Sequence, residues 1–141
     1  MNEYLDAGLD AFWSETLAAS TGTERPPFSA VVKTSGQAVY LSGQTYPVIG
    51  STDAVAPALV GMREQTEACL QNLDRLITAA GGSRSDIVKV TIFNTRMSEQ
   101  PVVNEVYREF FGEHRPVRSH VEVSRLADPD LLIEIEAIAS L

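Results

Sequence analysis

The sequence is poor in the residues that usually build metal and redox sites. It has one cysteine, Cys69, and two histidines, His114 and His120, among 141 residues. A single cysteine excludes an internal disulfide, and its place in a helical pattern predicts a buried thiol. These three residues do not show ligand spacing with a carboxylate scaffold, so no metal site is expected. The chain also lacks a phosphate-binding glycine loop and a G-x-S-x-G elbow, and it implies no cofactor.

Basic residues are scarce as well. There are 11 Lys and Arg against 19 Asp and Glu, which gives a net charge of −8 and a sequence pI near 4.7. Nucleic-acid affinity rests largely on basic side chains that neutralise phosphates, so this charge argues against a nucleic-acid partner. The N-terminus has no basic segment and no long apolar run, which argues against a secretory signal and a membrane span. We therefore expect a cytoplasmic protein without a membrane partner.

The apolar residues that are present suffice for one core. At 141 residues and 44% hydrophobic, the chain has the size and composition of one ordinary domain. A breaker-rich linker follows residue 20, which divides the chain into residues 1–25, a helical extension with its linker, and residues 26–141, the main domain. One amphipathic helix, with Asn2 as a possible N-cap, is predicted for residues 1–20 from the helical spacing of Leu5, Leu9, Phe12, Trp13 and Leu17.

The main domain reads as strands that alternate with helices. Their order is two strands, a helix, a strand, a helix and two strands, which predicts an α+β fold in which a mixed sheet carries both helices on one face. The first two strands are expected to form a hairpin. Ser98 is expected to cap the second helix. The predicted strands cover residues 28–33, 38–44, 86–94, 115–124 and 131–139, and the helices cover about 59–80 and 98–111.

The last two predicted strands carry charges in otherwise apolar sequence. Residues 131–139 are apolar on both faces except at Glu134 and Glu136, the pattern of a strand covered on both sides. A sheet face of that size left open in a monomer usually marks an interface. In the preceding strand, Arg118 and His120 share one face, because side chains repeat every second residue.

Each charged residue allows more than one interpretation. Arg118 offers a planar fork of donors that matches a carboxylate, but it can equally form a structural ion pair with Glu122. Glu134 suits proton exchange with water, or it pairs with an arginine at a rim. Glu136 shares its face, and spacing alone does not say which glutamate reaches a site. A lone histidine is more often a bystander, although His120 beside an arginine could titrate near neutral pH.

Several motifs together resemble the RidA/YjgF family of small trimeric proteins, also called the endoribonuclease L-PSP family. Its members end in a pattern close to P-A-R-S-x-V-E-V-x-x-L followed by I-E-I-E-A-I-A. This chain reads P-V-R-S-H-V-E-V-S-R-L from Pro116 and I-E-I-E-A-I-A from Ile133. Further family marks are L-S-G-Q at 41–44, N-L at 72–73 and V-N-E-V-Y at 103–107. The resemblance covers about Pro27 to Leu141 in the family's order and spacing.

The resemblance implies a fold and a reaction. The fold is the chorismate-mutase-like (YjgF) fold with a central last strand, assembled as a homotrimer whose sites lie in clefts between subunits. The reaction is deamination, in which water hydrolyses a small 2-imino or enamine carboxylic acid to a 2-keto acid and ammonia. By the same resemblance, Arg118 holds the substrate carboxylate, Glu134 orients the water and carries its proton, and Glu136 is structural.

The resemblance also places Ser42, Gly43 and Asn104 near the substrate. For each of them, a plain turn or helix-packing role stays open. The chain departs from the family at two positions. Phe28 stands where members often have a tyrosine, so a hydroxyl is missing, and His120 stands where they often have a cysteine. Both are expected to shape the pocket.

Other functions remain open at this point. The chain can be a trimeric module that binds a small carboxylate or another metabolite without turning it over. It can also be a specialised pathway enzyme that acts on a larger enamine. A ribonuclease is supported only by the family's older name, and the net charge of −8 argues against it.

Overall fold

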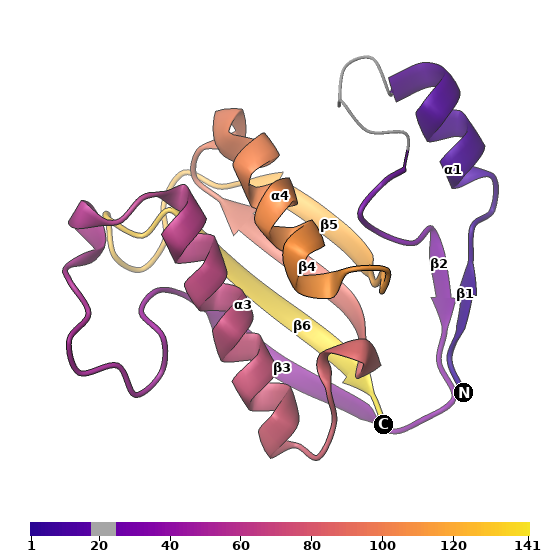
Figure 1. Cartoon of the computed structure of the whole chain (residues 1–141), viewed down its shortest axis with the longest axis horizontal. Helices are drawn as coiled ribbons and strands as arrows, with labels where there is room; N and C mark the ends of the chain where they lie inside the picture. Colours follow the sequence, from indigo (N-terminus) through magenta and orange to yellow (C-terminus); the bar gives the residue numbers. More distant parts are fainter. Residues whose placement is uncertain (18–24) are drawn as a thin grey trace.

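A four-stranded sheet with two helices packed on one face dominates the computed structural model, which describes residues 1–17 and 25–141 (Figure 1). A separate two-stranded sheet lies beside it, near both chain ends. The predicted α+β architecture with both helices on one face is confirmed. The strands are β1 (Glu3–Leu5), β2 (Val31–Lys33), β3 (Ala38–Gln44), β4 (Ile87–Asn94), β5 (Val117–Glu122) and β6 (Ile133–Ser140), and the helices are α1 (Leu9–Phe12), α3 (Met62–Ala79) and α4 (Gln100–Phe111).

Short helical turns join several of these elements. A π-helical turn, Trp13–Leu17, continues α1, and 3-10 turns cover Pro57–Leu59, Arg84–Asp86 and Met97–Glu99. In the described part of the chain, no helix combines the length and apolar character that crossing a membrane requires.

The last strand is interior to the main sheet. The strand order is β3-β6-β4-β5, with β6 antiparallel to both of its neighbours and β4 parallel to β5. The crossover from β4 to β5 runs through α4, and the connection from β3 to β4 runs through α3. The sheet is therefore mixed, and β6 has the central position that the family resemblance implies.

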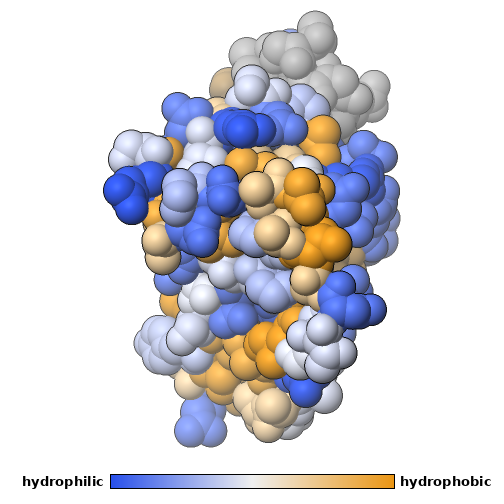
Figure 2. Space-filling view, turned by 90° about the vertical axis from the view of Figure 1, so that its left-hand side faces the viewer, coloured by the Kyte–Doolittle hydropathy of each residue, from blue (hydrophilic) through white to orange (hydrophobic). Residues whose placement is uncertain are grey.

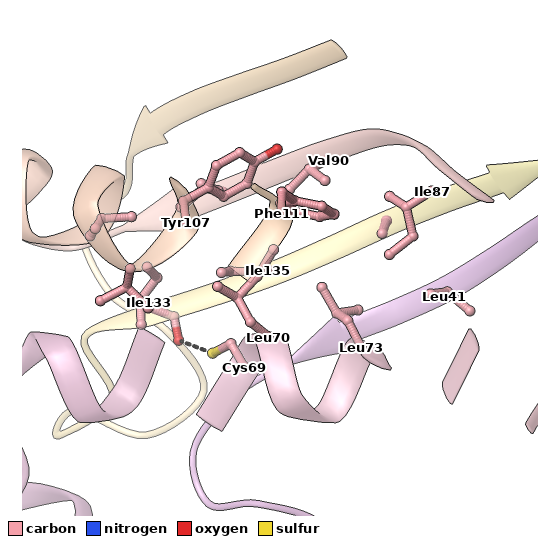
Figure 3. Packing of buried hydrophobic residues seen from close by; sticks show 14 of the residues in the cluster. Leu41, Cys69, Leu70, Leu73, Ile87, Val90, Tyr107, Phe111, Ile133 and Ile135 are labelled. Atoms are coloured by element: carbon pink, nitrogen blue, oxygen red, sulfur yellow. Dashed lines mark hydrogen bonds between the residues drawn. The ribbon is translucent and has the colours of Figure 1, made fainter. Parts of the chain in front are cut away.

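Alternation along β6 decides which residues enter the core. Ile133, Ile135 and Ala137 face the helices and are at most 2% exposed, while Glu134 and Glu136 face away from them. In Figure 3, Leu70 and Leu73 of α3 and Tyr107 and Phe111 of α4 pack toward these strands. The second face of the sheet has no helix on it, so one chain covers only half of the sheet.

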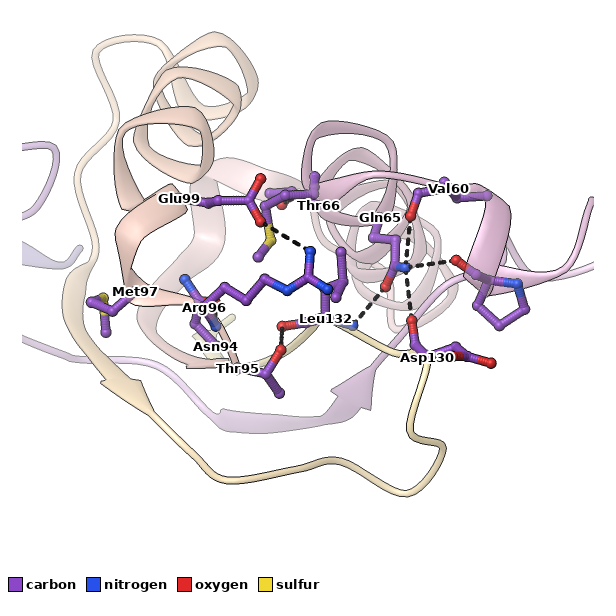
Figure 4. Close-up of polar contacts among 12 residues, drawn as sticks. Val60, Gln65, Thr66, Asn94, Thr95, Arg96, Met97, Glu99, Asp130 and Leu132 are labelled. Atoms are coloured by element: carbon purple, nitrogen blue, oxygen red, sulfur yellow. Dashed lines mark hydrogen bonds and ion pairs between the residues drawn. The ribbon is translucent and has the colours of Figure 1, made fainter.

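A buried amide fixes the entrance to β6. Gln65 of α3 donates through Nε2 toward the carbonyl oxygens of Pro57, Val60 and Asp130, each 3.2 Å away, and its Oε1 accepts from the Leu132 N–H at 2.9 Å (Figure 4). Thr95 Oγ1 also donates to the Leu132 carbonyl, at 3.0 Å. One side chain thus ties two loops together directly before the strand that carries Glu134.

The helix predicted for residues 1–20 is wrong in its extent. Leu5 lies in β1, where it pairs with Val31 of β2, and helical structure begins only at Leu9. Gly8, with a φ of 84°, makes the turn between the two, a conformation that glycine adopts without strain. Asn2 caps no helix, because its Oδ1 accepts from the Ser35 N–H. Residues 18–20 of the predicted helix lie outside the described residues.

The hairpin predicted for residues 28–44 is also wrong. The first of its strands pairs with β1, and β3 pairs with β6. The segment between them is held by the C-terminus: Gln37 and Leu141 exchange two backbone hydrogen bonds of 2.6 and 2.9 Å, and Gly36 N donates to Ser140 Oγ at 3.1 Å. These contacts direct the chain onward into the main sheet, so it does not fold back on β2.

The predicted cap of the second helix is wrong as well. Ser98 lies inside the 3-10 turn Met97–Glu99, and α4 begins after Glu99 without a side-chain cap. Pro101 in the first turn of α4 lacks the N–H that a cap would satisfy there, which makes a capping side chain less necessary.

Replacing Gln65 should destabilise the protein strongly. Gln65→Ala leaves three partly buried carbonyl groups and the buried N–H of Leu132 without their partner, so the free energy of unfolding should fall by about 2–4 kcal/mol. Denaturant unfolding measures this. Gln71→Ala, an exposed glutamine of the same helix, is the matched control and should change the value by less than about 0.5 kcal/mol. Equal effects of the two substitutions would contradict the proposed role of Gln65.

Candidate functional site

A guanidinium group is the centre of the candidate site. Arg118 projects from β5 on the helix-covered face, since its register partner on β4 is the buried Val90. Its Nη1 donates to Asn104 Oδ1 of α4 at 2.8 Å. Two aromatic rings flank it, with its Cζ 4.9 Å from the ring centroid of Tyr107 and 5.2 Å from that of Phe28. Cation–π contacts of this kind hold an arginine without neutralising it.

Arg118 has no carboxylate partner among residues 1–17 and 25–141. The ion pairs of the described residues all involve other cations, so the structural pair with Glu122 that the sequence left open does not form. Instead, Glu122 accepts from the Met97 N–H at 2.9 Å. Burial, with a further contribution from the charge of Arg108, lowers the pKa of Arg118 to about 10. At neutral pH it therefore remains a half-buried cation without a carboxylate partner among the described residues.

His120 lies on the same face as Arg118 and is held neutral. Asn94 Oδ1 accepts from the Arg96 N–H at 2.7 Å, so the Asn94 amide nitrogen faces His120 Nε2, 3.1 Å away, and donates to it. Nε2 is then the acceptor of this hydrogen bond, and the amide nitrogen of Gln100 lies 3.4 Å from Nδ1. Burial, and secondly the charge of Arg118, lowers the pKa of His120 to about 4. The sequence allowed His120 to titrate near neutral pH, but in the structure this ring titrates at acid pH.

Glu134 and Gly43 form a second cluster. They lie together where β3 runs beside β6, at an irregularity in the pairing between Leu41 and Gln44. A Cβ atom at residue 43 would overlap the carboxylate of Glu134, so only glycine leaves this carboxylate its place. Ser42 is exposed beside them, and Glu136 is exposed farther along the strand. The structure thus distinguishes the two glutamates, because only Glu134 is half-buried against the glycine turn.

The two clusters lie on opposite faces of the sheet. Glu134 pairs in register with Phe93 of β4, on the face without helices, whereas Arg118 pairs with Val90 on the helix face. The strand β4 also separates β5 from β6, a distance of about 10 Å across two strand spacings. One chain therefore cannot bring Arg118 and Glu134 to the same small molecule.

The structure adds Tyr107 to the predicted residues. Its side chain is fully buried, its ring lies against Arg118, and its hydroxyl has no hydrogen-bond partner in the part of the chain that the structure describes. Burial raises the pKa of this hydroxyl, so it stays protonated. Its spacing of three residues from Asn104 places both on one face of a helix, a signal that was present in the sequence.

The described residues show no cluster of metal-binding side chains. In residues 1–17 and 25–141, no three His, Cys, Asp or Glu side chains gather as a metal site would require. His114 is used elsewhere: its Nε2 lies 2.6 Å from the Ile87 carbonyl oxygen, and its ring meets Tyr4 edge to face.

Comparison with known proteins supports the family resemblance. The sequence model of a family described as Endoribonuclease L-PSP matches residues 22–141. A 2-iminobutanoate/2-iminopropanoate deaminase of Salmonella typhimurium is 43% identical over 107 residues, which cover 74% of this chain and 80% of that protein.

Solved structures agree in fold. Escherichia coli TdcF with bound serine superimposes with a TM-score of 0.66 at 37% identity, covering 82% of this chain and 89% of that one. Rv2704 of Mycobacterium tuberculosis, described as a member of the YjgF/YER057c/UK114 family, gives a TM-score of 0.63 at 29% identity and covers both chains completely.

The neutral state of His120 predicts how stability depends on pH. Its pKa is lower in the folded protein, about 4, than the ordinary 6.5, so the unfolded chain binds more protons between these values. The free energy of unfolding should therefore fall as the pH decreases from about 6.5 to 4, by about 1–3 kcal/mol from this group.

Denaturant unfolding across that pH range measures the effect, and His120→Gln should remove it. His114→Gln is the matched comparison, since burial also lowers the pKa of His114. If His120→Gln unfolds with the pH dependence of the unchanged protein, the buried neutral ring is not the cause.

Proposed function

The chain belongs to the endoribonuclease L-PSP family, which includes the RidA and YjgF proteins, and from that premise we propose that it is an imine deaminase. It hydrolyses small 2-imino or enamine carboxylic acids to 2-keto acids and ammonia. A relative named for this activity is 43% identical over most of the chain, and the arrangement around Arg118 supplies what such a substrate needs.

The observation that carries the proposal is the unpaired charge of Arg118. A buried cation without a counterion is costly, and it persists in folded proteins when something else gains from it. Here two rings and one amide hold the guanidinium, while its remaining N–H groups have no carboxylate to bind among the described residues. The carboxylate of a substrate can accept two parallel hydrogen bonds from these N–H groups.

The water-activating residue comes from a neighbouring copy. Since Arg118 and Glu134 lie on opposite faces, a complete site requires the open sheet face of one chain to meet the β5 edge of another. The open face offers the apolar surface for such an interface: Tyr40 is 76% exposed and Val121 is 43% exposed. A closed ring of three copies would repeat the same contact and build three equal sites.

Apolar side chains also reach the surface away from that face. Figure 2 shows them in patches among polar residues on the side that carries residues 45–61, where Leu59 is 78% exposed. The neighbour in the ring can cover part of this loop as well as the sheet.

In the proposed reaction, Arg118 fixes the carboxylate and thereby places the C=N carbon. Glu134 of the neighbour takes a proton from a water molecule, whose oxygen bonds to that carbon. As that bond forms, the C=N π electrons move to the nitrogen of the protonated imine, which gives a neutral carbinolamine. Glu134 returns its proton to this nitrogen, the C–N bond breaks with its electron pair on the departing ammonia, and the hydroxyl proton passes to Glu134 as the carbonyl of the 2-keto acid forms. Most of the rate gain would come from positioning and from fixed dipoles in a site that excludes bulk water.

The two departures from the family act on binding. Phe28 keeps the ring beside Arg118 but lacks the hydroxyl, so it contributes the cation–π contact alone. His120 stays neutral beside Arg118, where Asn94 fixes the orientation of its ring. We propose that Asn104, which holds Arg118, acts through this arginine, while Ser42 and Gly43 supply backbone groups beside Glu134.

Removing the guanidinium should abolish turnover without harming the fold. Arg118→Ala should lower kcat/KM for 2-iminobutanoate by one to several decades, since a buried charge-assisted pair with the carboxylate is worth about 2–5 kcal/mol. Arg118→Lys should recover little, because an ammonium cannot form the two parallel hydrogen bonds. Ammonia release from freshly generated imino acid measures both.

Stability provides the internal control. Taking away a half-buried charge that has no carboxylate partner relieves a desolvation cost, so Arg118→Ala should not lower the melting temperature much. Arg75→Ala changes the net charge equally at an exposed position of α3 and should leave turnover unchanged. If Arg118→Ala unfolds the protein while the molecules that remain folded keep full activity, the arginine is structural and the proposal fails.

A further inference from the structure

The segment before the family match is anchored by specific contacts. β1 pairs with β2 over Glu3–Leu5, and Tyr4 meets the ring of His114 edge to face, with centroids 5.5 Å apart. Arg25 lies 3.4 Å from the Asp10 carboxylate and 3.6 Å from that of Glu113, although these exposed pairs stabilise little. The pairing and the aromatic contact therefore set where this segment lies.

One side chain of this segment reaches the candidate site. Trp13 meets Phe28 edge to face, with ring centroids 5.7 Å apart and an interplanar angle of 86°. Phe28 in turn lies 5.2 Å from the Cζ of Arg118. A chain of three contacting side chains thus runs from the N-terminal segment to the carboxylate clamp.

Phe28 has open space beside it. It lines a cavity of about 270 Å³, between residues 4–10 of the N-terminal segment and residues 113–115. This space would let the Phe28 ring turn away from the arginine. An edge-to-face aromatic contact is directional, so it holds a ring in one orientation.

We propose that Trp13 is a positioning residue of the substrate site: it backs Phe28, and Phe28 keeps the guanidinium of Arg118 aligned for a carboxylate. Residues 1–17 then belong to the site, although the family match begins only at residue 22. This inference rests on the proposed function, since it assigns the segment to the same carboxylate clamp. Trp13 acts on binding, whereas Glu134, on the other face of the sheet, carries the proton.

Trp13 is the single tryptophan of the chain, so tryptophan fluorescence reports on this residue alone. Adding 2-oxobutanoate, the keto-acid product, should change the fluorescence of the full-length protein with a saturable dependence on concentration. The same titration of Arg118→Ala should show only the non-saturable absorption of the ligand. If calorimetry detects binding that Arg118 requires while the tryptophan signal stays flat, Trp13 is not coupled to the clamp and the inference is overturned.

Kinetics provide the second test. Trp13→Ala should raise KM for 2-iminobutanoate about fivefold to tenfold, the size of one cation–π contact, and should change kcat less than about twofold. Trp13→Phe should restore most of the affinity, since it keeps an aromatic edge against Phe28. Phe12→Ala is the matched control, because Phe12 is 54% exposed in the same short helix, and its KM should not change.

The outcomes separate this inference from the proposed function. An unchanged protein that binds carboxylates but does not turn over imino acids contradicts the deaminase proposal and leaves the fluorescence test valid. Normal turnover with equal KM in Trp13→Ala and the unchanged protein contradicts the inference alone. If Trp13→Ala does not fold, Trp13→Phe and the fluorescence titration still test the positioning role of Trp13. A tenfold increase of KM in Trp13→Phe would show that Trp13 does not act as an aromatic support for Phe28.

Discussion

A positive charge without a partner governs the structure of the candidate site. Arg118 is partly shielded from water by α4 and by two aromatic rings, and the described residues offer it one amide oxygen and no carboxylate. Ordinary folding would pair or expose such a charge, because its desolvation is unfavourable. The surrounding residues therefore leave the positive charge of Arg118 without a counterion. They hold the guanidinium in one orientation, keep the nearby His120 neutral, and leave its hydrogen-bonding capacity to a ligand.

The sheet imposes the second constraint. Side chains on neighbouring positions of a strand point to opposite faces, and the registers of β4 with β5 and with β6 place Arg118 and Glu134 on different faces. A catalyst that needs both must therefore use two chains. The same sheet leaves one face without helices, with apolar side chains exposed on it. In the proposed function, this face serves both assembly and catalysis, which would account for a carboxylate beside Gly43 on a face that otherwise suits an interface.

Much of the fold could be predicted because its signals are local. The period of α3, the stop at Gly81 and Gly82, and the apolar alternation of β6 each depend on neighbouring residues only. The sequence does not predict β1 or the partner of β2, because both are decided at long range, by the pairing of β1 with β2 and by the C-terminal residues that bind Gln37. Residue types and the family motifs indicated Arg118 and Glu134, but their separation across the sheet depends on strand register. The helical spacing of Asn104 and Tyr107 indicates a shared face, whereas the contact of Trp13 with Phe28 depends on packing between distant segments, which no motif encodes.

The most direct test of a site shared between copies is to mix two inactive variants. Arg118→Ala and Glu134→Gln each lack one half of every site, and oligomers assembled at random from equal amounts of both would contain intact pairs at about a quarter of their interfaces. Co-produced variants should therefore recover about a quarter of the 2-iminobutanoate turnover of the unchanged protein, while each variant alone shows almost none. If mixed oligomers form and their turnover stays at the level of the separate variants, Arg118 and Glu134 do not act together across an interface, and the account is contradicted.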